Sequence, residues 1–77
     1  MNDVKYPTIE VQLSGNDGNA FAVLGAVQRA LKSSVGADGE FETRAEAEAA
    51  SSEFYAEATT GDYDHLLQTA MRWVSVS

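Results

Sequence analysis

The side chains best suited to chemistry lie together at residues 62–65, which read Asp-Tyr-Asp-His. His65 is the single histidine of the chain, and a carboxylate such as that of Asp62 or Asp64 could orient it for acid–base work. Successive residues of a helix point in different directions, however, and no serine, cysteine or second histidine stands at a recognisable spacing. A metal ion would need further ligands from elsewhere in the chain. We therefore expect Asp62, Tyr63, Asp64 and His65 to form a helix cap and a candidate contact surface, with no catalytic or metal site.

A second candidate is the turn at residues 15–18, Gly-Asn-Asp-Gly, which precedes a predicted helix. Glycine-rich loops at helix N-termini bind anions, but this turn has neither the P-loop pattern nor Gly-x-Gly-x-x-Gly. Asp17 would repel a phosphate. The run from Asn16 to Asn19 also lacks the twelve-residue spacing and final glutamate of a calcium loop. We expect a capped turn whose Asp17 and Asn19 could contact a partner, and no cofactor.

The charge of the chain is strongly negative and unevenly placed. The net charge is −7, from 12 acidic residues against five Lys or Arg, and nine of the acids lie between residues 38 and 64. Proteins hold duplex phosphates through Lys and Arg, so this surface predicts no direct nucleic-acid binding. An acidic band suits a basic partner, or only a soluble surface.

Length and composition indicate one small soluble domain. The 77 residues are 44% hydrophobic and include no cysteine, which excludes disulfides, thiolate metal sites and cysteine nucleophiles. The start of the chain lacks the basic and apolar regions of a signal peptide, and no stretch approaches the roughly 18 apolar residues of a membrane span. We expect a cytoplasmic protein without a membrane partner, with residues 1–6 as a flexible N-terminal tail.

A strand and a helix are expected in the first half of the chain. Residues 8–13 alternate apolar and polar side chains, as in a half-buried strand. Residues 19–34 repeat apolar side chains at three- and four-residue spacing, which predicts an amphipathic helix. Gly25 costs that helix about 1 kcal/mol relative to alanine, so we expect another element to pack closely against it.

Two further helices are expected in the second half. Thr43 followed by Glu46 has the capping-box pattern that begins a helix, which extends to about residue 59. Gly61 fits the left-handed conformation that often ends a helix. Asp62 fits the N-cap of a third helix.

These elements predict a single α+β domain, residues 1–77, in the order β-α-α-α-β. Residues 8–13 and 73–76 would form a small two-stranded sheet covered on one face by three helices. The last segment also fits a continued helix, but we favour the strand. We expect Phe41 and Trp73 in the core, although Trp73 would also suit the centre of an interface.

Two stretches of the chain have distinctive sequences: DGNAFAVLGAV at residues 17–27 and GDYDHLLQTAMRWV at residues 61–74. Together they resemble a group of small uncharacterised proteins found in bacteria and bacteriophages. The resemblance implies an origin and brings no activity, substrate or catalytic residue. This chain departs from the group in the length of the acidic Ala/Glu segment before Phe54.

The sequence therefore favours a non-catalytic accessory or regulatory protein, phage-derived, that acts by binding another protein. An alternative is an acidic mimic of nucleic acid that blocks a DNA- or RNA-binding partner through the glutamates of the second helix. Those residues are Glu46, Glu48, Glu53 and Glu57. The least supported hypothesis is an enzyme or ligand-binding protein centred on Asp17 and residues 62–65.

Self-association is also expected, as a homodimer. A strand at residues 8–13 with few neighbours leaves its backbone groups open, and Pro7 and Glu10 protect it only sparsely. Pairing across a two-fold axis would satisfy those groups and could bury Ile9, Val11 or Trp73. The acidic second helix would face away from the interface.

Overall fold

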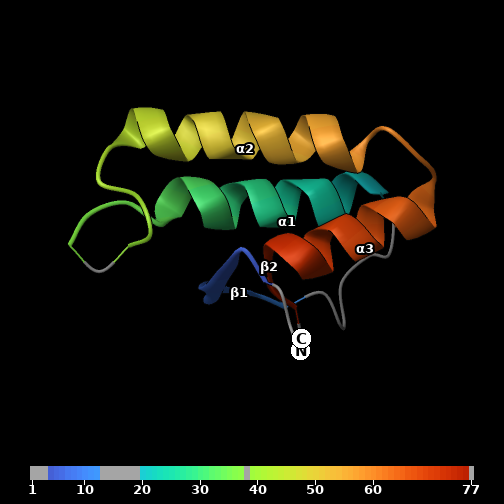
Figure 1. The fold of residues 1–77 in the computed structure, drawn as a ribbon, viewed down its shortest axis with the longest axis horizontal. Helices are drawn as coiled ribbons and strands as arrows, with labels where there is room; N and C mark the ends of the chain where they lie inside the picture. Colours follow the sequence, from blue (N-terminus) through green and yellow to red (C-terminus); the bar gives the residue numbers. More distant parts are fainter. Residues whose placement is uncertain (1–3, 13–19, 38, 77) are drawn as a thin grey trace.

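The computed structural model describes residues 4–12, 20–37 and 39–76 (Figure 1). Its elements in chain order are β1 (Tyr6–Val11), α1 (Ala20–Ser33), α2 (Arg44–Ala58), α3 (Tyr63–Trp73) and β2 (Val74–Val76). The predicted α+β class and the order β-α-α-α-β are confirmed. The predicted turn at residues 15–18 lies outside the described residues.

The two strands pair in parallel, with Tyr6 opposite Val74 and Val11 opposite Val76. A parallel pair cannot be closed by a tight turn and needs a crossover connection. The three helices provide that crossover. Because β2 has three residues, the sheet is too small to be stable alone, and it depends on the helices packed against it.

β1 begins at Tyr6, two residues before the predicted start, so Tyr6 belongs to the sheet and not to a tail. The backbone N–H of Lys5 also donates to the carbonyl of Arg72, 2.8 Å away. Pro7 has no N–H to donate, and it falls where the register of the pair shifts. There the hydroxyl of Ser75 donates to the Pro7 carbonyl at 2.9 Å.

The core lies between the helices and the strands. α1 and α3 pack directly on the sheet, and α2 packs on α1 and α3, farther from the strands (Figure 1). The buried hydrophobic residues come from every element and are Ile9, Val11, Val23, Leu24, Val27, Leu31, Phe41, Ala47, Ala50, Phe54, Ala58, Leu66, Ala70, Trp73 and Val74. Four of them are alanines, three of which lie on α2, so α2 can approach its neighbours closely.

The start of α2 confirms the predicted capping box. Oγ1 of Thr43 accepts from the backbone N–H of Glu46, and Oε1 of Glu46 accepts from the backbone N–H of Thr43, both at 3.2 Å. Two backbone donors that the first turn would leave unpaired are satisfied in this way. The cap fixes the direction in which the chain enters α2.

The connection between α1 and α2 is anchored by Phe41, which is buried as expected. Val35 and Phe41 form an isolated parallel bridge, and the N–H of Gly36 donates to the Phe41 carbonyl at 3.0 Å. Gly36 has φ of 111°, a left-handed value that favours glycine. The Phe41 ring meets the edge of Tyr6, with centroids 5.1 Å apart. The connection is thereby joined to β1.

The prediction for Gly25 is wrong. Among the described residues, a Cβ added at this position would have no atom within 4 Å outside its own helix, so none of the described strands or helices packs against it. Gly25 lies on the side of α1 away from the buried Val23, Leu24 and Val27. The cost of glycine in this helix is therefore not offset by a close contact.

The prediction for Gly61 is also wrong, because Gly36 is the one glycine with positive φ among the described residues. α2 ends at Ala58, and the N–H of its C-cap residue, Thr59, is directed at the carbonyls of Tyr55 and Glu57. A Cβ on Gly61 would lie 2.9 Å from Cβ and Cγ of His65. Glycine fits at position 61 because any larger residue would crowd the side chain of His65.

We expect Gly25→Ala to stabilise the protein by about 0.5–1 kcal/mol, because alanine has the higher helix propensity and fits without a clash. Gly39→Ala is the matched control. A Cβ at Gly39 would collide with the carbonyl group of Ser34, so this variant should be destabilised. Urea denaturation followed by circular dichroism measures both. A loss of stability in Gly25→Ala would mean that the glycine has a packing role after all.

Candidate functional site

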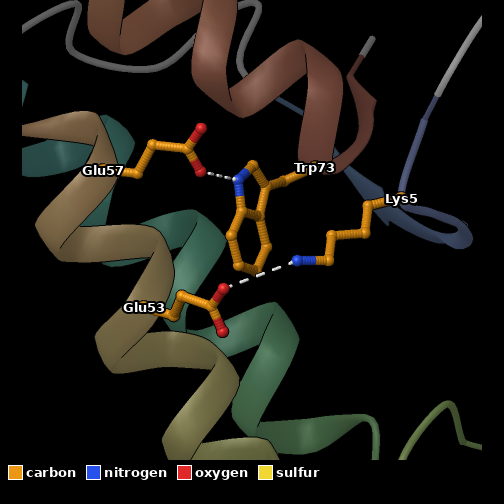
Figure 2. Close-up of polar contacts among 4 residues, drawn as sticks. All are labelled: Lys5, Glu53, Glu57 and Trp73. Carbon is orange, nitrogen blue, oxygen red and sulfur yellow. Dashed lines mark hydrogen bonds and ion pairs between the residues drawn. The ribbon is translucent and has the colours of Figure 1, made fainter.

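Trp73, one of the candidate interaction residues, is 3% exposed and lies where α3 meets β2. Its ring packs against Phe54 of α2 and Tyr6 of β1, with centroid separations of 5.6 and 5.8 Å. The indole Nε1–H donates to Oε2 of Glu57 at 2.7 Å (Figure 2). The expectation that Trp73 belongs to the core is confirmed, and almost none of its surface is left for a partner.

Lys5 lies on the Trp73 ring, as Figure 2 shows. Its Nζ is 4.2 Å from the ring centroid and 3.7 Å from Oε1 of Glu53. The cation–π contact and the exposed ion pair each contribute at most about 1 kcal/mol. We call Lys5, Glu53, Glu57 and Trp73 the Trp73 cluster. It joins the segment before β1 to α2 and α3.

His65 is half-buried, and its ring is held at the turn between α2 and α3. Nε2 lies 2.9 Å from the carbonyl oxygen of Glu57 and 3.1 Å from Oγ1 of Thr60. A carbonyl oxygen can only accept, so Nε2 carries the proton and donates to it. The Thr60 hydroxyl donates to the same carbonyl at 2.8 Å. While these contacts are kept, Nε2 cannot act as a general base.

Asp62 is the N-cap of α3, as predicted, because its Oδ1 accepts from the backbone N–H of His65 at 3.0 Å. Asp64 is exposed in the first turn, where the helix dipole favours a negative charge. Among the described residues, no three His, Cys, Asp or Glu side chains are grouped to hold a metal ion. Asp17 and Asn19 lie outside those residues.

An aromatic pocket of about 260 Å³ opens where the ends of three helices meet. Phe21 of α1, Tyr55 of α2 and Tyr63 of α3 line it, and their exposed fractions are 81%, 44% and 40%. Asp62 and the buried Leu66 also line it. In the part of the chain that the structure describes, one other large hydrophobic side chain is exposed, that of Met71, and it does not line this pocket. Tyr63 and Asp62 are the sequence candidates that the fold brings to this pocket.

Phe21 and Tyr55 were not among the residues expected to form a site. Each lies off the apolar stripe of its own helix, which would have been the available signal. A large aromatic residue away from the core stripe is exposed unless something else covers it. That the two residues share a pocket with Tyr63 depends on how the helices pack.

Comparisons with protein-family models, with curated proteins and with solved structures found no match to this chain. The resemblance to small bacterial and bacteriophage proteins therefore stays a prediction. Within the described residues, no helix is both long enough and apolar enough to cross a membrane.

We expect Glu57→Ala to lower the free energy of unfolding by about 1–3 kcal/mol, because the indole N–H of Trp73 loses its acceptor. Glu57→Gln keeps an acceptor oxygen and should cost less. Glu53→Gln is the matched control, because it removes only an exposed ion pair and should cost under about 1 kcal/mol. Urea denaturation followed by circular dichroism measures the free energy of unfolding of each variant. Equal stability of Glu57→Ala and the unmodified protein would show that this hydrogen bond does not support the fold.

Proposed function

We propose that this chain is a small non-catalytic accessory or regulatory protein that acts by binding another protein. The observation that carries the proposal is the aromatic pocket, where Phe21, Tyr55 and Tyr63 are exposed together. Apolar surface rimmed by polar groups is typical of protein contact sites. Aromatic residues are also enriched at the centres of interfaces.

Two of the residues that could have supported catalysis, Asp62 and His65, have structural partners. Asp62 caps α3, and the ring of His65 donates to the end of α2. A catalytic pair would need His65 free to exchange a proton with a substrate. This assignment of their contacts favours a binding role over an enzymatic one.

The alternative of a nucleic-acid mimic draws less support from the described contacts. Of the four glutamates expected to form its surface, Glu46 belongs to the capping box, Glu53 pairs with Lys5 and Glu57 accepts from Trp73. A mimic needs a row of charges available to a basic partner. Glu48 is the remaining member and is exposed.

We also propose a bacterial or bacteriophage origin and a cytoplasmic location. The origin draws on the resemblance of residues 17–27 and 61–74, and the location on the lack of cysteine. The net charge of −7 favours protein partners over nucleic acid or an anionic membrane surface.

The proposal is tested by purifying the bound protein from native host cells and rebuilding the complex from pure components. We expect a stoichiometric complex whose affinity changes little between about 0.15 and 0.5 M salt, because apolar contacts are not screened. A steep loss of affinity with salt would favour the nucleic-acid mimic. If no protein binds, and a turnover is found that His65→Ala abolishes without unfolding the chain, the protein is an enzyme.

A homodimer is proposed through the open edges of the two-stranded sheet. Ile9, Val11 and Trp73 are already buried within one chain, so they add nothing to such an interface. The exposed Met71 and the half-buried Val76 lie together beside β2 and provide apolar surface there. Unpaired strand groups at this edge would provide the hydrogen bonds.

We expect sedimentation equilibrium at about 0.15 M salt to give the mass of a dimer at tens of micromolar protein, with dissociation at low salt, where the net charges repel most strongly. Met71→Lys should shift the equilibrium to the monomer, because it adds a cation to the apolar edge. A monomer mass for the unmodified chain at every concentration would contradict the dimer.

A further inference from the structure

In the described part of the chain, the aromatic pocket is built from the ends of the three helices and the turn between α2 and α3. It combines the first residues of α1, the last turn of α2 and the first turn of α3. Phe21 contributes the most exposed side chain, and the backbone beneath it is held in a helix. The pocket is therefore a rigid apolar recess with aromatic walls.

The size of the pocket fits one side chain better than a free small molecule. Pockets for small molecules have volumes of about 300–1,000 Å³, and this one is about 260 Å³. Anchor residues of protein partners enter recesses of this kind, where they lose contact with water. The expected occupant is an apolar side chain that belongs to a larger molecule.

The charged groups around the pocket indicate which charge a partner should carry. Among the described residues, the lining includes one charged group, Asp62, and Asp64 is exposed two residues later in the chain. None of the five cationic side chains, all of which are described, lines the pocket. They are Lys5, Arg29, Lys32, Arg44 and Arg72.

The cations of the helices stand at the ends that face away from the pocket. They occupy the second half of α1, the first residue of α2 and the last turn of α3. Lys5 is paired with Glu53 and Trp73. The positive end of the α3 dipole, which could attract an anion, is capped by Asp62. The rim is thus negative without a nearby compensating charge.

We propose that the aromatic pocket binds a basic segment of a partner protein and takes one apolar side chain of that segment between Phe21, Tyr55 and Tyr63. This inference rests on the proposed function and specifies the surface and the chemistry of the partner. A second copy of this chain is disfavoured at the pocket, because it carries the same net charge of −7. A neutral or acidic segment would lack the attraction to Asp62 and Asp64.

The probe is a short capped lysine-rich peptide with one central phenylalanine, titrated into the isotope-labelled full chain and followed by nuclear magnetic resonance. We expect saturable shifts of the backbone amides of Phe21, Tyr55 and Tyr63. A peptide with serine in place of phenylalanine should bind at least about tenfold more weakly, because burial of the ring is lost. A peptide with glutamate in place of lysine should not bind.

Phe21→Ser should weaken binding of the phenylalanine peptide about tenfold, and Tyr55→Ser provides a second variant from another helix. The two side chains are 81% and 44% exposed, and circular dichroism checks that each variant keeps its fold. Gln68→Ala is the control, since Gln68 is exposed on α3 and is not among the residues that line the pocket, and the affinity of this variant for the phenylalanine peptide should be unchanged.

Equal binding of the phenylalanine and serine peptides, or shifts confined to the glutamates of α2, would overturn the inference. Either result leaves the proposed function standing, because that function is tested with the natural partner. If a natural protein partner is found and its affinity is the same for Phe21→Ser and for the unmodified chain, the pocket is not its binding site. Absence of any protein partner would reject the proposed function itself.

Discussion

Burial of Trp73 joins the distant parts of this small chain. The residue ends α3 and stands next to β2, its ring packs on Phe54 and Tyr6, and its indole N–H donates to Glu57. A two-stranded sheet is marginal by itself, and this one also has a shift of register. The indole gives that sheet a contact with α2, which otherwise lies farther from the strands. A polar atom on a buried aromatic ring needs a partner, and Glu57 of α2 provides it.

Glu57 links this cluster to the turn between α2 and α3. Its side chain accepts from Trp73, and its backbone carbonyl accepts from the ring of His65 and the hydroxyl of Thr60. The last carbonyls of a helix lack partners within the helix, so these donors satisfy groups that would otherwise need water. The tight turn that results places the end of α2 beside the start of α3. Tyr55 and Tyr63 face one pocket for this reason.

The same contacts show that Asp62 and His65, which were candidates for acid–base chemistry, have structural roles. Acidic residues and a histidine at helix ends are well suited to capping, since carboxylates accept from unpaired N–H groups and an imidazole N–H donates to unpaired carbonyls. In this chain, Oδ1 of Asp62 and Nε2 of His65 are engaged in this way. The aromatic pocket, whose described lining is mainly apolar and includes Asp62, is the surface on which the proposed contact with a basic, apolar-anchored segment rests.

The sequence by itself determined the class and order of the elements, the capping box at Thr43, the N-cap at Asp62 and the burial of Phe41 and Trp73. These features depend on side-chain periodicity and on hydrogen bonds within a single turn, which a few neighbouring residues encode. Only the tertiary structure decided the parallel pairing of the strands, the open space beside Gly25, the contact of Gly61 with His65 and the meeting of Phe21, Tyr55 and Tyr63 in one pocket. Each of these depends on which elements lie side by side, because the direction of a side chain is set locally whereas its neighbours are set by the packing of residues far apart in the chain.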